Sequence, residues 1–327
     1  MDSRLKATVF IPVYNGEKDH LEETLEALYQ QETKFEWDVL ITDSGSSDRS
    51  VQIIESFADK YGNLSLKKID KRDYSHGRTR QWAAEVSKGE FMVYLTQDAV
   101  PYNKDWLTEM IAPFELSSKV VAVVGRQKPR LTCFPAMKYD IEAVFDEQGS
   151  RDAITLWTRK EPLFVGKYTK ESFYSDVCSA APRKFLLEEI PYRSVPYSED
   201  YEFGKDVVDA GYIKAYNGKA VVEHSNDVRL SEYRKRIFDE NYYIRLNSGT
   251  TNNVSIFSVA LNSMKGFLKD TPKILVDRDF SWKRKCYWLC VNPLFHIERW
   301  RGIRLANKVD FDVDVSQLSL EKSRDRK

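Results

Sequence analysis

The sequence has few cysteines, and they are scattered along it. The four thiols, Cys133, Cys178, Cys286 and Cys290, form neither the spaced pairs of a zinc site nor the framework of a disulfide-rich domain. We therefore expect buried thiols in a reducing cytoplasm. No apolar stretch reaches eighteen residues, and the first apolar run, ATVFIPVY, is too short for a signal peptide's core plus cleavage site. These absences predict a chain without a membrane span.

The chain also lacks an excess of charge of either sign. Its 50 basic and 50 acidic residues cancel, so the chain as a whole has no electrostatic footprint for nucleic acid. PVYNGE stands where the dinucleotide fingerprint G-x-G-x-x-G would follow the first strand, and the loop G-x-x-x-x-G-K-[ST] occurs nowhere. These absences argue against a nicotinamide dehydrogenase and a P-loop nucleotidase. What is present is a chain of 327 residues, 42% of them hydrophobic, which can bury a sizeable core.

Short apolar runs alternate with amphipathic ones over the first 130 residues, which is typical of βαβ units and a parallel sheet. LEETLEALYQQ, for example, repeats leucine at the spacing of a helix. Past residue 130 the alternation loosens, although YSEDYEFGKDVVDAGY still predicts a helix and IKAYNGKAVVEH a strand. We therefore expect an α/β fold with a domain boundary near residue 228. The strands predicted before the loosening are KATVFIPVYN, EWDVLITDS, LSLKKID, GEFMVYLTQD and SSKVVAVVGR.

Polar residues follow several of the predicted strands directly. Ligands of open α/β sheets bind beyond the carboxyl ends of the strands, so these residues are the first candidates for a binding site. They are Pro12, Tyr14 and Asn15 after the first strand, Asp43 after the second, and Thr96, Gln97 and Asp98 after the fourth.

Four segments resemble, in order and spacing, the motifs of family 2 glycosyltransferases with the GT-A fold. They are VFIPVYNGEKDHLEETLEALYQQ, DVLITDSGSSDRSVQII, GRTRQWAAEVSKGEFMVYLTQDAVP and YSEDYEFGKDVVDAGY. The resemblance implies a GT-A catalytic domain over residues 1–228, a mixed and mainly parallel sheet flanked by helices. Its nucleotide-sugar half would lie in residues 1–130 and its acceptor half in residues 131–228. DSGSSD, HGRTRQWAA and LTQDAVP further resemble bacterial rhamnosyltransferases that build cell-wall polysaccharides.

The resemblance implies roles for the residues that follow the strands. Pro12, Tyr14, Asn15 and Gln97 fall in the nucleotide-sugar-binding motifs. Asp98 matches the carboxylate that holds Mg²⁺ or Mn²⁺ against the diphosphate, and such hard cations prefer oxygen ligands. Thr96, however, stands where the family usually has the first Asp of its Asp-x-Asp motif. A helix cap or a turn would explain Asp98 without function.

Two further strand-end residues match family positions. Asp43 matches the carboxylate that accepts a hydrogen bond from the imide N–H of uracil or thymine, although an Asp before Ser-Gly is also an ordinary turn residue. His224, directly after KAVVE, occupies a position where some relatives supply a further metal ligand. A lone histidine is more often structural, so both readings of His224 stay open.

Asp200, in SED at a predicted helix start, matches the family's catalytic base. The resemblance implies single displacement with inversion, in which this carboxylate takes the proton of the acceptor hydroxyl. Glu199 is expected to orient Asp200, and the helix start to keep Asp200 ionised. Arg78 and Arg80 open a helix near the expected diphosphate, and an arginine fork suits phosphate oxygens. Acidic residues are also common in any first helical turn, so position alone does not assign the base.

Residues 229–327 lie outside the resemblance in any detail. SEYRKRIFDENYYIRLNSG, SIFSVALNSMKGFLKDTPKIL and SWKRKCYWLCVNPLFHIERWRGIRLANK predict helices, and the last two combine basic with aromatic residues. Contact with an anionic membrane surface, packing on the catalytic domain and a homodimer interface each explain this composition. The final SLEKSRDRK is expected to form a disordered tail.

These expectations together predict a glycosyltransferase that moves L-rhamnose from dTDP-β-L-rhamnose to a lipid-linked saccharide at the cytoplasmic face of the membrane. Rhamnose rests on the resemblance alone, because Asp43 and the arginines do not distinguish thymidine from uridine. A transferase that uses a UDP-hexose and an inactive nucleotide-binding partner in a glycan assembly complex remain alternatives. A nucleotidyltransferase is disfavoured, since PVYNGE lacks that class's glycine-rich start.

Overall fold

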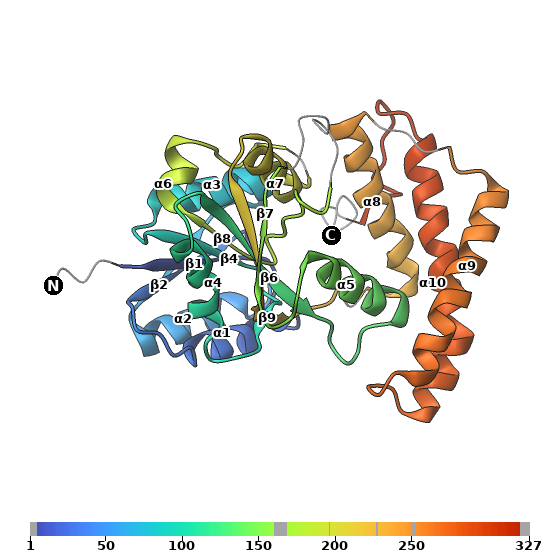
Figure 1. The fold of residues 1–327 in the computed structure, drawn as a ribbon, viewed down its shortest axis with the longest axis horizontal. Helices are drawn as coiled ribbons and strands as arrows, with labels where there is room; N and C mark the ends of the chain where they lie inside the picture. Colours follow the sequence, from blue (N-terminus) through green and yellow to red (C-terminus); the bar gives the residue numbers. More distant parts are fainter. Residues whose placement is uncertain (1–4, 160–168, 196, 227, 250–252, 321–327) are drawn as a thin grey trace. The chain divides into compact units, whose positions relative to one another are not determined.

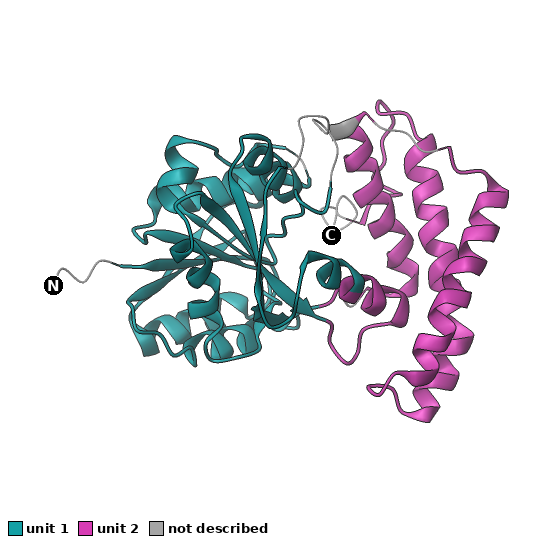
Figure 2. Ribbon diagram, in the orientation of Figure 1, with its two compact units in different colours: residues 1–128, 143–224 teal, residues 129–142, 225–327 magenta. Residues whose placement is uncertain are grey.

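The computed structural model describes residues 5–159, 169–195, 197–226, 228–249 and 253–320. The chain divides into two compact units, which Figure 2 distinguishes by colour. Unit 1 comprises residues 1–128 and 143–224, and unit 2 comprises residues 129–142 and 225–327. The domain boundary at residue 228 stays a prediction. The expectation of a disordered tail is wrong for its first two residues, because Ser319 and Leu320 are buried and Leu320 N donates to Asp239 Oδ2 at 2.8 Å. Residues 321–327 lie outside the described residues.

A nine-stranded mixed sheet forms the centre of unit 1 (Figure 1). Its strand order is β3-β2-β1-β4-β8-β6-β9-β5, and β7 pairs with β9. β1, β2, β3 and β4 pair in parallel, as do β6 and β9, whereas β8 runs antiparallel between β4 and β6. The bounds are β1 Ala7–Val13, β2 Trp37–Asp43, β3 Leu64–Lys68, β4 Phe91–Leu95, β5 Val100–Pro101, β6 Val120–Lys128, β7 Ile154–Trp157, β8 Cys178–Pro182 and β9 Ile213–Glu223.

Helices cover both faces of this sheet, with α1 and α2 on one side and α3, α6 and α7 on the other (Figure 1). The leucines predicted as a helical stripe, Leu21, Leu25 and Leu28, are fully buried against alternate residues of β1. The predicted α/β layering is confirmed. The helices that lie wholly in unit 1 are α1 Leu21–Tyr29, α2 Ser50–Tyr61, α3 His76–Val86, α4 Trp106–Ile111, α6 Arg183–Glu188 and α7 Glu199–Asp209, with 3-10 turns at Lys71–Asp73 and Ala112–Glu115.

One edge of the sheet collects the ends of many elements. The parallel strands all finish there, and the antiparallel β8 begins there. The helices α3 and α7 each precede a parallel strand, so they run back across the sheet and their first turns also lie near this edge. Residues that are far apart in the sequence therefore meet where ligands of such sheets bind.

Unit 2 is helical. It consists of residues 129–142, which include the start of α5 (Pro135–Gln148), together with α8 (Leu230–Ser248), α9 (Ile256–Val276) and α10 (Trp282–Lys308). The three helices predicted for this part of the chain are confirmed. α10 contacts both α8 and α9, and Phe134, Tyr233 and Phe295 form an aromatic core. Within the described part of the chain, no helix combines the length and apolar character needed to cross a bilayer.

The thiols differ from expectation in one respect. Cys133 and Cys178 are buried, as predicted, whereas Cys286 and Cys290 are exposed on α10. The prediction of four buried thiols is wrong for this pair, because the two residues lie on the side of α10 that faces away from its helical neighbours.

Candidate functional site

A row of polar side chains lies along the edge of the unit 1 sheet at which the parallel strands end, which we call the strand-end edge. Asp98 follows β4 and His224 follows β9, and Asp98 Oδ2 lies 3.2 Å from His224 Nε2. His224 Nδ1 lies 2.9 Å from Gln127 Oε1 at the end of β6, and Gln127 Nε2 donates to Ser175 Oγ at 3.2 Å. The edge therefore brings together Asp98 and His224, which are 126 positions apart in the sequence.

The tautomer of His224 follows from this row. With the Gln127 amide in this orientation, Oε1 faces His224 Nδ1 and can only accept a hydrogen bond, so Nδ1 is the donor. In the neutral imidazole, Nε2 presents a lone pair to the Asp98 carboxylate at 3.2 Å. Two electron-rich atoms this close require a proton or a cation between them.

A metal ion at this point would find two protein ligands, one oxygen and one nitrogen. Among the described residues, no group of three or more His, Cys, Asp and Glu side chains could hold a metal. Thr96, at the position of the missing first carboxylate, has a buried Oγ1 without a hydrogen-bond partner. The remaining ligands would therefore have to come from a substrate or from water, as is common for Mg²⁺.

Gln97 fixes the loop that follows β1. Its Oε1 accepts a hydrogen bond from Tyr14 N at 2.9 Å, and its Nε2 donates to Tyr14 O at 3.3 Å and to Asp19 Oδ2 at 2.9 Å. Asn15 has a positive φ of 50° and accepts at Oδ1 from Ser47 N. The amide of Gln97 is thus already engaged with protein partners, so the structure places it as a support of this loop.

Two neighbours of that loop were also predicted from the sequence. Pro12 is paired with Thr42 of β2, inside the sheet. The Tyr14 hydroxyl accepts a hydrogen bond from Lys71 Nζ at 3.1 Å, and Lys71 also lies over the Tyr14 ring. The Tyr14 ring is therefore held at the strand-end edge by a cation.

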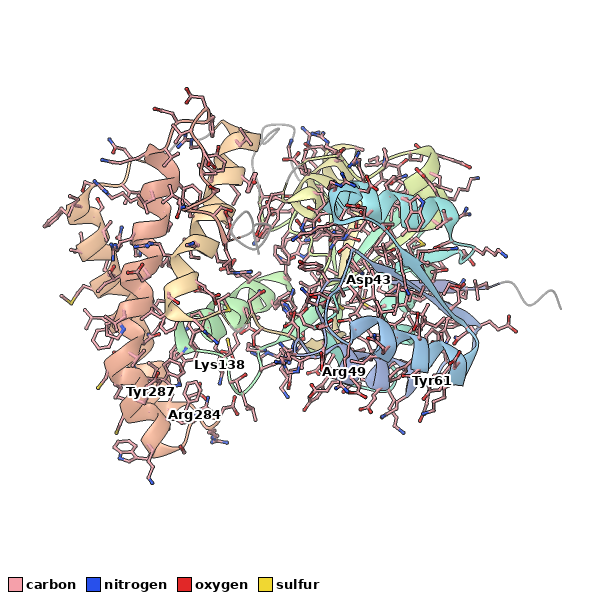
Figure 3. All side chains as sticks on the ribbon, turned by 180° about the vertical axis from the view of Figure 1, so that it is seen from behind. Asp43, Arg49, Tyr61, Lys138, Arg284 and Tyr287 are labelled. Carbon is pink, nitrogen blue, oxygen red and sulfur yellow. The ribbon has the colours of Figure 1, made fainter. Side chains whose placement is uncertain are left out.

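Asp43 ends β2 at the same edge (Figure 3). Its side chain is buried, and Oδ2 accepts from the backbone N–H groups of Gly45 and Ser46 at 3.0 and 3.1 Å. The other oxygen, Oδ1, is buried without a hydrogen-bond partner. A buried carboxylate oxygen without a donor is costly, so Oδ1 is poised to accept a hydrogen bond from a ligand.

A second cluster joins α3, the segment before β8 and the start of α7. Arg80 Nε lies 2.7 Å from Asp176 Oδ2, and Arg80 Nη1 donates to Glu199 Oε1 at 2.9 Å. All three side chains are buried, and Tyr192 OH donates to Asp176 Oδ1 at 2.8 Å. Arg80 thus faces carboxylates, and the expected contact of Arg80 with a diphosphate does not follow from this arrangement.

Asp200 is the member of the cluster that remains partly accessible. It accepts a hydrogen bond at Oδ1 from Tyr201 N, and its side chain is half-buried. Burial, with the charges of Glu199 and Asp176, raises the pKa of the Asp200 carboxyl well above its ordinary value. Burial and the two neighbouring carboxylates thus act against the helix terminus, which on its own would favour the ionised form of Asp200.

Arg78, the other predicted arginine of α3, differs from Arg80 in exposure. Arg78 is exposed, so of the two arginines it is the one whose guanidinium is open to solvent. His76 Nδ1 lies 3.1 Å from Tyr74 OH and 3.9 Å from Glu199 Oε1. His76 therefore lies beside the carboxylate cluster.

Sequence reasoning missed two residues of these clusters, Asp176 and Gln127. Gln127 was within reach of the rule that polar residues at strand ends line the site, whereas Asp176 was not. Gln127 lies beyond the apolar part of the predicted strand SSKVVAVVGR, and β6 extends to include it. Asp176 precedes β8, a strand that was not predicted because CSAAP is short and rich in small residues.

Several known proteins are similar to this chain. Residues 8–188 match the family model described as glycosyl transferase family 2. The O-antigen chain rhamnosyltransferase RfbN of Salmonella typhimurium is 29% identical over 239 residues, which cover 72% of this chain and 71% of that protein. The O-antigen chain rhamnosyltransferase WbaN of Salmonella anatum is 29% identical over 236 residues, which cover 71% and 70%.

Solved structures show a similar fold. The mannosyltransferase PcManGT from Pyrobaculum calidifontis, in complex with GDP-Man and Mn²⁺, has a TM-score of 0.58 at 15% identity, with 94% of this chain and 89% of that chain covered. Residues 1–349 of TarS from S. aureus have a TM-score of 0.51 at 16% identity, with 92% and 91% covered. At identities this low, the structural similarity shows the fold alone. It confirms the predicted α/β sheet flanked by helices, with a helical C-terminal region.

Proposed function

Because this chain belongs to glycosyl transferase family 2 and has the GT-A fold, it is a glycosyltransferase, and we propose that it transfers L-rhamnose from dTDP-β-L-rhamnose. The rhamnosyltransferases RfbN and WbaN, each matched over more than two thirds of its length, support the choice of sugar. The observation that carries the transfer chemistry of this proposal is the placement of Asp43, Asp98 and Asp200 at one edge of the sheet, where the three carboxylates can serve three different tasks.

Asp43 reads the base in this proposal. The imide N–H of thymine would donate to the buried Oδ1, which has no hydrogen-bond partner. The backbone donors of Gly45 and Ser46 hold Oδ2 and so fix the direction of the free lone pairs. A base whose N–H is absent at this position would leave the carboxylate buried and unpaired, which costs affinity.

Asp98 and His224 would hold a divalent cation against the diphosphate. They fit such an ion because a carboxylate oxygen and an imidazole lone pair face each other at 3.2 Å. A bound Mg²⁺ or Mn²⁺ would offset the negative charge that develops on the leaving diphosphate. The exposed Arg78 is the protein group we assign to the phosphate oxygens, whereas Arg80 holds Asp176 and Glu199 in place.

Asp200 would act as the general base. The acceptor hydroxyl oxygen forms a bond to the anomeric carbon as the bond from that carbon to the diphosphate oxygen breaks, and the diphosphate leaves with the electron pair. The hydroxyl proton passes to the Asp200 carboxylate. The attack on the face opposite the leaving group converts a β-linked donor into an α-linked product. A raised pKa suits this role, since a base whose pKa lies nearer the working pH accepts a proton more readily.

The acceptor in this proposal is a lipid-linked saccharide of a growing cell-wall polysaccharide. Such an acceptor is held at a membrane, so the chain would work in peripheral contact with the cytoplasmic face. The names of the two Salmonella relatives, which concern O-antigen chains, support a polysaccharide acceptor.

The test is a thermal-shift comparison of dTDP-rhamnose, UDP-glucose, UDP-N-acetylglucosamine and GDP-mannose, each with Mn²⁺ and with excess chelator. A ligand that binds only the native state raises the melting temperature. We expect the largest shift for dTDP-rhamnose, a smaller one after chelation, and none for the Asp43→Ala variant. A shift confined to GDP-mannose, or no shift with any nucleotide sugar, would overturn the donor assignment.

A further inference from the structure

A row of exposed apolar side chains runs along α9. Phe257, Leu261, Met264, Leu268 and Leu275 are 76%, 43%, 59%, 61% and 43% exposed. They recur at intervals of three, four or seven residues, so they share one face of the helix. Soluble proteins seldom leave so many large apolar side chains together on one surface without a partner.

The opposite side of α9 is fixed against α10 by polar contacts. Asp270 Oδ2 lies 2.7 Å from His296 Nε2 and accepts a hydrogen bond from Asn292 Nδ2 at 3.0 Å. Ser263 Oγ donates to His296 O, and a side chain at Gly266 would overlap the His296 ring. Because these buried polar groups would lose their partners if α9 turned, the apolar row cannot rotate inward.

The charge around this row is of one sign. Lys265 and Lys269 are exposed beside it, and the single carboxylate of α9, Asp270, is buried against His296. From residue 253 to residue 308 the sequence has eleven Lys and Arg but four Asp and Glu. The other three acids are also paired: Asp277 and Asp279 with Lys138, and Glu298 with Arg301.

We propose that the α9 face, defined as Phe257, Leu261, Met264, Leu268 and Leu275 with Lys265 and Lys269, docks on an anionic lipid bilayer. Apolar side chains enter the boundary between headgroups and acyl chains while lysines meet anionic headgroups, which is how interfacial helices bind. A second copy of the chain fits less well, because two such faces would bring lysines together with no exposed α9 carboxylate to pair them. The proposal rests on the proposed membrane-bound acceptor and names the surface that would reach it.

Of the three basic residues at the start of α10, Lys283 is exposed, whereas Arg284 and Lys285 contact the protein. Arg284, labelled in Figure 3, donates to Leu131 O at 2.7 Å and lies against the Phe280 ring. Lys285 donates to Leu275 O at 2.7 Å. These two cations are already engaged with the protein, whereas Lys265 and Lys269 are exposed. The α9 lysines are therefore the ones to test.

The experiment is sedimentation of the full chain with vesicles, in the absence of donor and acceptor. Vesicles of phosphatidylcholine alone are compared with vesicles that contain about 30% phosphatidylglycerol, at low salt, where charge attraction is least screened. The double variant Leu261→Gln/Leu268→Gln removes apolar groups from the face. Leu116→Gln is the matched control, since Leu116 is 56% exposed and lies in unit 1.

We expect the wild type and the control to bind the anionic vesicles and to bind phosphatidylcholine alone much less. The double leucine variant should bind the anionic vesicles at least about tenfold more weakly than the wild type. Its melting temperature should be unchanged, because both side chains are exposed. Lys265→Glu/Lys269→Glu should lose binding by a similar or larger factor.

The proposal would be overturned if both double variants bound anionic vesicles as tightly as the wild type does. It would also be overturned if the wild type did not bind anionic vesicles. A dimer in analytical ultracentrifugation that Leu261→Gln/Leu268→Gln dissociates, without vesicle binding, would assign the face to a second copy. Failure of this proposal can be distinguished from failure of the proposed function. Transfer to a water-soluble acceptor does not need the membrane, so each variant should retain the wild-type rate in that assay.

Discussion

At the scale of single residues, the candidate base is controlled by its charged neighbours. Glu199 and Asp176 pair directly with the buried Arg80, whereas Asp200 does not. Burial raises the pKa of the Asp176 carboxyl to about 6, with the Arg80 charge opposing the shift and Glu199 adding to it. Burial and the charges of these same two carboxylates also raise the pKa of the Asp200 carboxyl. The proton affinity of the proposed base thus depends on its burial and on two neighbouring carboxylates.

Asp200→Asn should bind the donor nucleotide nearly as the wild type does and lose turnover by about a hundredfold or more. An amide keeps the shape of the side chain but cannot accept the acceptor's proton, and a positioned base is worth at least this factor. Donor affinity from titration and kcat from steady-state kinetics separate the two effects. Equal losses in both would indicate a structural role.

The pH dependence gives a second test. A raised pKa keeps Asp200 protonated and inactive as a base at low pH, so kcat/KM should rise with pH through the pKa of Asp200. Glu199→Gln removes a negative neighbour, which favours the ionised form and lowers the pKa of Asp200. The acidic limb of the kcat/KM profile should therefore move to lower pH. Glu189→Gln, an exposed change outside the cluster, is the control and should leave the limb in place. A limb that moves upward in Glu199→Gln would contradict this assignment.

Asp98→Asn should keep the fold and abolish transfer, and nucleotide binding should no longer depend on the cation. Its amide removes the charge that faces His224 Nε2 and would hold the ion. Isothermal titration with and without Mn²⁺ measures the dependence, and Asp105→Asn, at an exposed position, serves as the control. Full activity in Asp98→Asn, or in the thoroughly chelated wild type, would count against the metal.

At the scale of elements, the site depends on how closely α3 approaches the segment before α7. Gly77 is buried in the first turn of α3, and a side chain there would overlap the Arg193 carbonyl and press on Glu199. The packing of α3 against this segment sets the distance between Arg80 and Glu199, and with it the environment of Asp200.

Gly77→Ala should destabilise the protein by about 1–3 kcal/mol, the usual cost of overpacking. Turnover should fall by a larger factor than donor affinity, because the displaced groups surround the base. Chemical denaturation and steady-state kinetics measure the two effects, with Glu85→Ala on the exposed side of α3 as the control. An active Gly77→Ala protein of wild-type stability would refute this role of the close contact.

Elements with clear periodicity were predictable from the sequence, and the others were not. The leucine stripe predicted α1, and the apolar runs predicted β1, β2, β4 and β6, because each signal lies within about ten residues. The ion pair between Arg80 and Glu199 joins residues 119 positions apart, and no local pattern encodes it. The exposed Cys286 and Cys290 were missed for a similar reason, since their burial depends on which side of α10 its neighbours cover.

At the scale of the whole molecule, the chain is electrically neutral but its charge is unevenly divided. The helices α9 and α10 carry a basic excess, whereas the candidate site in unit 1 gathers carboxylates around Arg80. The sequence predicted the three C-terminal helices but not that residues 129–142 belong to unit 2. Phe134 and Met137 pack there against Tyr233 and Phe295, through contacts between distant parts of the chain.

The central claim is transfer of rhamnose with inversion, and a direct transfer assay tests it. The full chain with Mn²⁺ is offered dTDP-β-L-rhamnose, UDP-glucose, UDP-N-acetylglucosamine or GDP-mannose, each with a synthetic lipid-linked saccharide, and the product's linkage is read by NMR. We predict preferential transfer from dTDP-β-L-rhamnose to give an α-linked rhamnoside, lost in Asp200→Asn. Preferential use of a UDP-sugar or of GDP-mannose, or a β-linked rhamnoside, would contradict the claim.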